Sequence, residues 1–352
     1  MAFLEIKNVA ARGIAVCAPK NVEDNLTILV FNEGEAERVI AQTGIKQKHV
    51  VENGNILASD MCLAAAEKLI ADLGWEKDTI EALCFVSLSH DYLEPPTACI
   101  LQDRLGLPES CMTMDMNQGC SGWVNGLATL SSLMMTGNVK RALLLNGDTS
   151  TLLNSPLDKE ARPLFGDAGA ATALEFDENA TAMKFNFGTR GKDFEAILRR
   201  FGGLRNPITE DSLKFKEIGE HIVRRDIDST MDGMSVFAFG MSTAPKSVKA
   251  LCEQYSIDLE GVDLFLMHQA NHYMNEKIRK KLKMPEEKSP YSLDEYGNTS
   301  SASIPLTIVA RCRESFENKK LKVMATAFGV GLAWGSVYME TDKIVCPEMI
   351  LI

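Results

Sequence analysis

Short apolar runs alternate along this chain with longer segments in which apolar residues recur about every 3.6 positions. The first half has such runs at 82–87, 112–116 and 142–145, each followed or preceded by an amphipathic stretch. Apolar runs of this length, separated by helical periods, are typical of buried strands that are joined by helices. The pattern therefore predicts an α/β architecture.

The clearest helical period follows residue 120. The apolar residues that share one stripe there are Trp123, Val124, Leu127, Leu130, Leu133 and Met134. Gly137 and Asn138 end the pattern, as expected at a helix C-terminus. We predict a helix over this segment with its apolar stripe in the core.

The second half repeats this arrangement. It predicts a strand at 264–267, helices at 271–283 and 301–313, and strands at 323–328 and 332–339. In each half a glycine precedes a reactive polar residue at a predicted helix start, in Gly119-Cys120 and in Gly297-Asn298. Two structurally similar halves would show this repetition. The segment 190–232 is rich in glycine and irregular, and it fits either a cap over a cavity or a rigid surface excursion.

Composition narrows the functional classes. The 352 residues are 45% hydrophobic and carry a net charge of −11, which disfavours nucleic-acid binding because phosphates require excess positive charge. No window approaches the roughly 20 apolar residues that span a bilayer. The start of the chain lacks a long apolar run, so we expect a cytoplasmic protein with no membrane partner.

Nine cysteines are scattered singly, without the paired spacing of zinc or redox sites, so no metal is expected. Only Cys120 stands between glycines at a predicted helix start, in Gly119-Cys120-Ser121-Gly122. Amide N–H groups at a helix N-terminus favour a thiolate. Cys120 is therefore the candidate nucleophile.

Two further polar residues stand at element ends, where side chains reach clefts. His268 follows the predicted strand at 264–267, and Asn298 precedes the helix at 301–313. Taken alone, His268 also fits a structural histidine, and Asn298 also fits a helix cap or turn residue.

Six motifs occur in an order that identifies a family. They are Gly119-Cys120-Ser121-Gly122, Phe165-Gly166-Asp167-Ala168-Gly169-Ala170, Met231-Asp232-Gly233-Met234-Ser235-Val236-Phe237, His268-Gln269-Ala270-Asn271, Gly297-Asn298-Thr299-Ser300 and Phe328-Gly329-Val330-Gly331-Leu332-Ala333-Trp334-Gly335. With these motifs the chain resembles the β-ketoacyl-acyl-carrier-protein synthase III family, a group of thiolase-fold condensing enzymes. The resemblance covers nearly the whole chain.

The resemblance implies a fold and an assembly. The fold would be the thiolase-like α/β fold, in which two pseudo-symmetric lobes form a five-layered αβαβα sandwich. We place the N-terminal lobe, with the cysteine, at 1–176 and the C-terminal lobe, with the histidine and asparagine, at 177–352. A homodimer is also expected from the resemblance.

The resemblance also implies a reaction with no permanently bound cofactor. An acyl group would move from a coenzyme A thioester, or another acyl thioester, to Cys120. Malonyl-acyl-carrier-protein would then lose carbon dioxide, and His268 and Asn298 would stabilise the enolate that attacks the acyl-cysteine. Backbone amides of Cys120 and Val330 would form the oxyanion hole. The family usually carries three glycines in this loop, so Val330 is a departure beside the acyl group.

Other substrate contacts follow from the same resemblance. Gly329 and Gly331, which flank Val330, would line the substrate. Gly233, Phe237 and Asn271 would line the pantetheine arm, although Gly233 and Phe237 also fit simple packing roles.

The residues that usually contact the nucleotide of coenzyme A in this family are partly replaced in this chain. Lys159 would contact a phosphate of coenzyme A. Arg38 and Gln42 stand where the family usually has a tryptophan and an arginine for the nucleotide, so the acyl donor could differ from coenzyme A.

A basic cluster follows His268 and consists of Lys277, Arg279, Lys280 and Lys281. By resemblance this helix borders the substrate entrance and docks the acidic carrier protein. The cluster also fits an ordinary solvated helix face, and the sequence leaves both open.

The main alternative keeps the fold and changes the reaction to another donor, or to an oxygen or nitrogen nucleophile. A papain-like protease would need a Cys-Gly-x-Cys-Trp segment, which is absent. A thiolase would need a second cysteine in a glycine loop, and a non-catalytic subunit would usually have lost one of the three polar residues.

Overall fold

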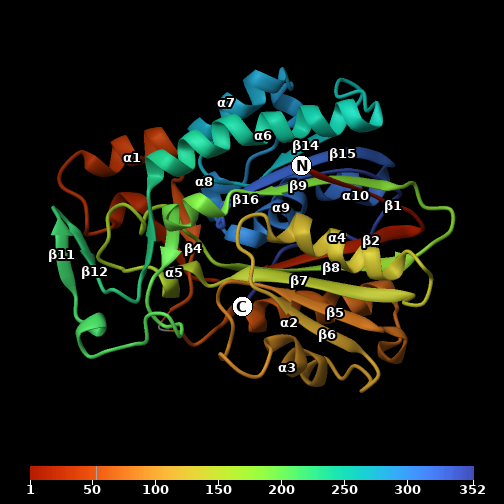
Figure 1. Ribbon diagram of the computed structural model, residues 1–352, viewed down its shortest axis with the longest axis horizontal. Coiled ribbons are helices and arrows are strands. Elements are labelled where there is room, and N and C mark those ends of the chain that lie inside the picture. The colour runs from red at the N-terminus through yellow and green to blue at the C-terminus, as the bar shows by residue number, and fades with distance from the viewer. Residues whose placement is uncertain (53) are drawn as a thin grey trace.

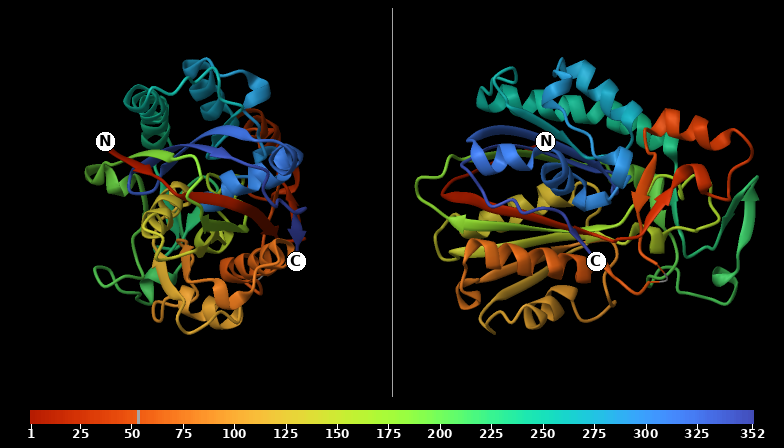
Figure 2. Two further views of the ribbon diagram at one scale, coloured as in Figure 1. Left: turned by 90° about the vertical axis from the view of Figure 1, so that its right-hand side faces the viewer. Right: turned by 180° about the vertical axis from the view of Figure 1, so that it is seen from behind.

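The structure is a computed structural model that describes residues 1–52 and 54–352. Its elements form five layers in the order helices, sheet, helices, sheet, helices (Figure 1). The rear view in Figure 2 shows the same stacking from the other side. The fold is the predicted thiolase-like sandwich, and the strands and helices expected in both halves are present.

The first sheet has six strands, and both of its faces are covered by helices (Figure 1). In spatial order they are β17 (Ile350–Leu351), β2 (Val9–Ala18), β8 (Ala168–Phe176), β7 (Arg141–Asp148), β5 (Ala82–Val86) and β6 (Met112–Met116). Strands β7, β5 and β6 are parallel. All five residues of β5 are buried, which explains its continuous apolar sequence.

The second sheet has five strands. In spatial order they are β1 (Ala2–Ile6), β9 (Met183–Thr189), β16 (Ala333–Thr341), β15 (Leu321–Gly329) and β14 (Leu264–Met267). Only β14 and β15 are parallel. The chain changes from the first sheet to the second between Phe176 and Met183, yet the terminal strands β1 and β17 each join the sheet of the opposite lobe.

Helices fill the other three layers (Figure 1). Those outside the first sheet are α2 (Ala58–Leu73) and α3 (Thr97–Arg104), and those outside the second are α6 (Gly233–Tyr255) and α7 (His272–Leu282). The central layer holds α4 (Gly122–Met134), α9 (Ser303–Thr307) and α10 (Arg313–Asn318). The remaining α-helices are α1 (Glu35–Thr43), α5 (Ser150–Leu153) and α8 (Leu293–Tyr296).

Short elements connect these layers. The 3-10 turns are η1 (Asn25–Thr27), η2 (Lys77–Thr79), η3 (Gly191–Ala196), η4 (Asp211–Leu213), η5 (Glu286–Lys288) and η6 (Ser300–Ala302), and η7 (Ile308–Cys312) is a π-helical turn. Small antiparallel pairs form between β3 (Val22–Asp24) and β4 (Gln47–His49), β10 (Ile197–Arg199) and β13 (Ser229–Met231), and β11 (Lys216–Gly219) and β12 (Ile222–Arg224).

The apolar stripe of α4 faces the core as predicted, with one exception. Leu133 is 38% exposed, whereas the other five apolar residues of the stripe are buried. Leu133 lies at the edge of the stripe in the last turn of the helix, where the covering layers end. The prediction was therefore wrong for this residue.

The predicted helix at 301–313 is broken into η6, α9, η7 and α10. Pro305 has no N–H to donate to the carbonyl of Ser301, four residues earlier. That carbonyl instead accepts a hydrogen bond of 2.7 Å from Asn146 Nδ2 at the end of β7. The irregular helix thus binds the first sheet beside the cavity described below.

The segment 190–232 contains η3, η4 and the pairs β10–β13 and β11–β12, so it is more regular than its sequence predicts. Among the described residues, no helix is long and apolar enough to pass through a lipid bilayer. Nor do the described residues contain a group of three or more histidine, cysteine, aspartate or glutamate side chains arranged to hold a metal.

Candidate active site

A cavity of about 490 Å³ lies between the two lobes and is lined by Cys120, His268 and Asn298. Cys120 precedes α4, His268 follows β14, and Asn298 lies between α8 and η6. The structure therefore brings together the three residues that the sequence singled out. Part of the segment 190–232 covers the cavity, through Ile197, Arg224 and residues 229–231.

Cys120 lies in the turn before α4, as predicted, but its thiol is not poised as a thiolate. Burial raises the pKa of Cys120 to about 11, and the nearby carboxylate of Asp148 adds to this rise. Hydrogen bonds from the backbone N–H groups of Val330 and Cys120 lower the pKa of the thiol, but by less than burial raises it. Burial therefore opposes the helix terminus, and the ionised thiol expected from the sequence is not favoured by this packing.

His268 is 2% exposed, and burial lowers its pKa to about 4. Its Nδ1 lies 2.8 Å from Ser303 Oγ, which also accepts the N–H of Gln269 at 3.4 Å. In the tautomer in which the Ser303 hydroxyl donates to Nδ1, the imidazole hydrogen is on Nε2. In that tautomer a neutral His268 offers Nε2–H as a hydrogen-bond donor.

Asn298 is held through its backbone and its side-chain oxygen. Its N–H donates to the Leu164 carbonyl at 2.8 Å, and its carbonyl accepts the Gly166 N–H at 3.1 Å. Its Oδ1 accepts the N–H of Ser300 at 2.9 Å, which is the turn role that the sequence left open. The side-chain amide nitrogen remains as the donor that Asn298 can offer a ligand.

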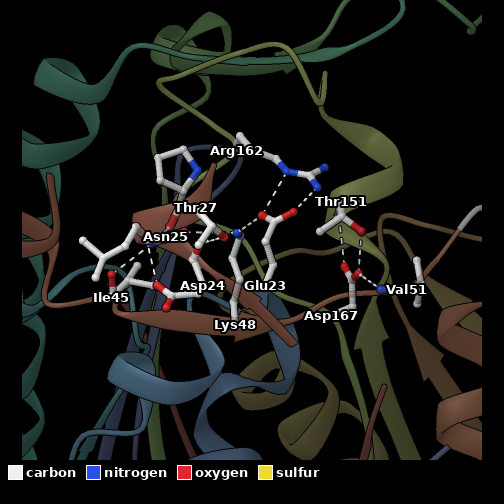
Figure 3. A network of polar contacts seen from close by, with 12 residues as sticks. Glu23, Asp24, Asn25, Thr27, Ile45, Lys48, Val51, Thr151, Arg162 and Asp167 are labelled. Carbon is white, nitrogen blue, oxygen red and sulfur yellow. Dashed lines mark hydrogen bonds and ion pairs between the residues drawn. The ribbon is translucent and has the colours of Figure 1, made fainter. Parts of the chain in front are cut away.

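A network of charged side chains around buried Lys48 lies in β3, β4 and the segment that follows α5 (Figure 3). Lys48 is 0% exposed and bonds to the carboxylate of Glu23 and to Asn25 Oδ1, the latter at 3.1 Å. Glu23 also pairs with Arg162, next to the cavity-lining residues 163–165. We call Glu23, Lys48 and Arg162 the Lys48 network.

The Lys48 network also touches the asparagine loop directly. A Cβ on Gly297 would lie 3.2 Å from the Cβ of Lys48 and 2.9 Å from the Leu164 carbonyl oxygen. Gly297 has a φ of 67°, so both its conformation and its close contacts favour glycine. The position of Asn298 thus depends on β3 and β4, which lie far from it in the sequence.

The loop predicted to complete the oxyanion hole lies beside Cys120. Gly329 and Val330 line the cavity, whereas Gly331 does not. The side chain of Val330 fills space next to the nucleophile: a Cβ on Gly119 would lie 3.1 Å from Val330 Cγ2 and 2.8 Å from Leu88 Cδ1. Val330 and Leu88 therefore narrow the cavity beside the sulfur.

The remaining predicted substrate contacts, Gly233, Phe237, Asn271 and Lys159, all line the cavity. Asn271 also caps α7, since its side chain accepts the N–H of Met274 at 2.8 Å. Lys159 is not free, because its Nζ lies 2.9 Å from Glu35 Oε1.

A row of side chains connects the cavity with the surface of α7. The ring of Phe237 stacks on Tyr273 at 5.8 Å, and Lys277 Nζ lies 5.2 Å from the centroid of the Tyr273 ring. Lys277, Lys280 and Lys281 are exposed and form the surface that we call the α7 lysine patch.

Arg279 does not belong to the α7 lysine patch. It is 9% exposed and donates two hydrogen bonds, of 2.6 and 2.7 Å, to the carboxylate of Glu276. A third donor reaches the carbonyl of Met284 at 2.8 Å. The structure thus contradicts its assignment as a docking residue, because the helical period turns this position toward the core.

Sequence reasoning missed three residues next to the site. Ser303 Oγ lies 2.8 Å from His268 Nδ1, and Ser300 lines the cavity with an unusual φ of 51°. Asp148 is 1% exposed and accepts hydrogen bonds from Leu88 N at 2.7 Å and Ser301 Oγ at 3.0 Å, so it joins the two lobes. A carboxylate three residues after the apolar run at 142–145 was the available signal for Asp148.

Two family models match the chain around these residues. Residues 114–191, which contain the cysteine, match the model described as 3-oxoacyl-[acyl-carrier-protein (ACP)] synthase III. Residues 252–341, which contain the histidine and the asparagine, match the model of the C-terminal part of the same enzyme.

Full-length relatives carry the same description. A putative 3-oxoacyl-[acyl-carrier-protein] synthase 3 of Campylobacter jejuni is 30% identical over 348 residues, which cover 96% of each chain. A β-ketoacyl-[acyl-carrier-protein] synthase III of Clostridium perfringens is 28% identical over 336 residues, covering 95% of this chain and 100% of the relative. The solved structure of a 3-oxoacyl-(acyl-carrier protein) synthase of Burkholderia xenovorans superposes with a TM-score of 0.93 at 33% identity, covering 100% of this chain and 99% of that one.

Proposed function

Because the chain belongs to the 3-oxoacyl-[acyl-carrier-protein] synthase III family, we propose that it condenses an acyl thioester with malonyl-acyl-carrier-protein through an acyl-cysteine on Cys120. The observation that carries the proposal is the shared cavity, which is lined by the thiol of Cys120, the imidazole of His268 and the carboxamide of Asn298. The names of the relatives reported above are those of condensing enzymes and do not favour transfer to an oxygen or nitrogen nucleophile.

The first step is acylation of Cys120. The bond between the acyl carbon and the donor sulfur breaks, a bond to Cys120 Sγ forms, and the thiol proton leaves with the departing thiol. Backbone N–H groups of Cys120 and Val330 already lie against the sulfur and are placed to receive the carbonyl oxygen that becomes negative.

The second step forms the carbon–carbon bond. The thioester carbonyl oxygen of the malonyl group accepts hydrogen bonds from His268 Nε2 and Asn298 Nδ2 while carbon dioxide leaves. The enolate attacks the acyl carbon on Cys120, the bond to sulfur breaks, and the sulfur takes up one proton from water. A histidine whose pKa is lowered to about 4 remains a neutral donor throughout, which suits stabilisation of an enolate oxygen.

The α7 lysine patch is the proposed docking surface for the carrier protein. The patch lies near the cavity, because Lys277 contacts Tyr273, which in turn stacks on the cavity-lining residue Phe237. A carrier protein with an acidic surface would bind there and extend its pantetheine arm past Phe237 and Asn271. No permanently bound cofactor takes part in this proposal.

A homodimer is proposed from the free edge of the first sheet. Strand β6 ends the described sheet order, and Met112 at its start is 43% exposed. In the nearby loop, Tyr92 is 64% and Leu93 is 94% exposed. A second copy of the chain would cover both this apolar surface and the unpaired backbone of β6.

Intact-mass spectrometry tests the proposed reaction. Incubation with an acyl thioester should add one acyl mass, and malonyl-acyl-carrier-protein should then remove it while a 3-oxoacyl product forms. Cys120→Ala should abolish the mass addition, whereas His268→Ala should retain it and block product formation. Product formation without any acylated intermediate would contradict the proposal.

A further inference from the structure

Every cation among the described residues that line the cavity is paired with a carboxylate that lines it too. Lys159 Nζ lies 2.9 Å from Glu35 Oε1. Arg224 pairs with Asp158 and, at 2.6 Å, with Glu160. These five residues contribute three negative and two positive charges, so we call them the acidic mouth of the cavity.

The pairs of the acidic mouth are not easily released. The Arg224 side chain is 12% exposed and that of Asp158 only 1% exposed. If Arg224 turned to an external phosphate, a buried carboxylate would lose its partner, which is unfavourable. The Lys159 and Glu35 side chains are 19% and 26% exposed, so this pair is also partly shielded from water.

Arg38 and Gln42 on α1 do not provide another positive charge in the cavity for a phosphate of the donor. Arg38 is exposed, its Nε donates to the Gly34 carbonyl at 3.0 Å, and it does not line the cavity. Gln42 is exposed and uncharged and does not line the cavity either. A nucleotide thioester with several phosphate charges would therefore meet a mouth of net negative charge.

Other lining residues carry no charge and suit a pantetheine arm. Thr43, Ala161, Phe237 and Asn271 present small, aromatic and amide groups without charge. Exposed positive charge lies outside the cavity, on the α7 lysine patch, where Lys280 is also 3.4 Å from Glu276 Oε2. Uncharged residues in the cavity would therefore contact the pantetheine arm. The exposed lysines outside it would contact the molecule to which the arm is attached.

We propose, on the basis of the condensation proposed above, that the acyl donor is an acyl group on the pantetheine arm of a carrier protein rather than on coenzyme A. Both half-reactions then take substrates from carrier proteins that dock on the α7 lysine patch. In the first step the thioester bond to the arm breaks, the bond to Cys120 Sγ forms, and the thiol proton passes to the arm.

Three donors with the same acetyl group test this inference. Acylation of Cys120 is followed by intact mass with acetyl-carrier-protein, acetyl-coenzyme A and acetyl-pantetheine. We expect the carrier protein to react at least about tenfold faster than coenzyme A, and coenzyme A to react no faster than pantetheine. A coenzyme A rate tenfold above that of pantetheine, or equal to that of the carrier protein, would overturn the inference while leaving the condensation intact.

A charge variant provides a gain-of-function test. Glu35→Gln frees Lys159, so the ratio of the coenzyme A rate to the pantetheine rate should rise about fivefold at low salt and fall back at high salt. Glu37→Gln is the matched control, because Glu37 is exposed on the same helix and does not line the cavity. An unchanged ratio in Glu35→Gln would overturn the assigned role of the acidic mouth. Absence of acylation with all three donors would instead contradict the proposed function itself, and this inference with it.

Discussion

Gly329 lies so close to Cys120 that a Cβ on the glycine would come within 2.7 Å of both the Cβ and the Sγ of the cysteine. A side chain at position 329 would therefore displace the sulfur from the backbone N–H groups that flank it. At Gly329 the loop expected to form the oxyanion hole therefore packs directly against the nucleophile.

Gly329→Ala is expected to slow acylation of Cys120 by about 10²-fold or more, the usual cost of a misplaced oxyanion donor. The rate of acyl-mass gain measures this. Gly191→Ala is the control, since a Cβ there meets no atom within 4 Å. Acylation at the normal rate in Gly329→Ala would show that the cysteine tolerates displacement.

The pKa of His268 predicts how the second step depends on pH. In a Cys120→Ala variant, release of carbon dioxide from malonyl-carrier-protein should stay constant from about pH 8 to pH 5, then fall with a midpoint near 4 as the imidazole is protonated. Desolvation favours the neutral ring, so the midpoint lies below that of a free histidine. A midpoint near 6.5 would contradict the buried, neutral state.

The Lys48 network should matter for stability and for only one half-reaction. Glu23→Leu leaves Lys48 buried without a carboxylate, which should lower the free energy of unfolding by about 3 kcal/mol, as measured by urea denaturation. Replacing Lys48 by Met in addition should recover part of this loss. Arg162 can still reach water, because its side chain is 25% exposed.

The activity of the Glu23→Leu, Lys48→Met double variant separates positioning from folding. Because the network supports the segment that holds Asn298, release of carbon dioxide should fall about tenfold while acylation of Cys120 changes little. Equal loss of both half-reactions would indicate general destabilisation instead.

Val330 should restrict the acyl group. Its Cγ2 fills space beside Gly119 and next to the nucleophile. In the series Val330→Ala and Val330→Gly, we expect a stepwise gain in acylation by branched and longer acyl groups, measured by intact mass with a panel of thioesters. The same ranking of acyl groups in all three proteins would show that another wall limits chain length.

The α7 lysine patch predicts a charge-dependent KM. Reversing Lys277 and Lys280 to Glu should raise the KM for malonyl-carrier-protein about tenfold at low salt, with little change for a malonyl-pantetheine substrate. Reversing the exposed residues Lys68 on α2 and Lys77 on η2 makes the same change in net charge and serves as the control. Helix α2 lies in the outer layer opposite that of α7 (Figure 1). Equal effects of the two double reversals would contradict a specific docking site.

Much of this fold could be predicted because its strands are short buried runs and its nucleophile is marked by glycines. Cys120 and His268 lie at element ends, where the sequence pattern locates them directly. Arg279 was misassigned although Met274, Ile278 and Leu282 mark the buried face of the same helix, so stricter use of the period would have excluded it.

Other parts of the site could not be read from the sequence. The Lys48 network joins positions 23, 48 and 162, and no local pattern links residues so far apart. The charge state of Cys120 was predicted from the helix start alone. The opposing effects of burial and of Asp148 depend on tertiary packing, so the pKa required the structure.

The first strand of the chain has a consequence for how this protein is made. Residues 2–6 pair with residues 183–187, so this strand leaves the ribosome long before its partner strand has been synthesised. Contacts of such long sequence separation form slowly. The edge of the second sheet is therefore completed late, and nascent chains stalled before residue 183 would present β1 unpaired to chaperones and proteases.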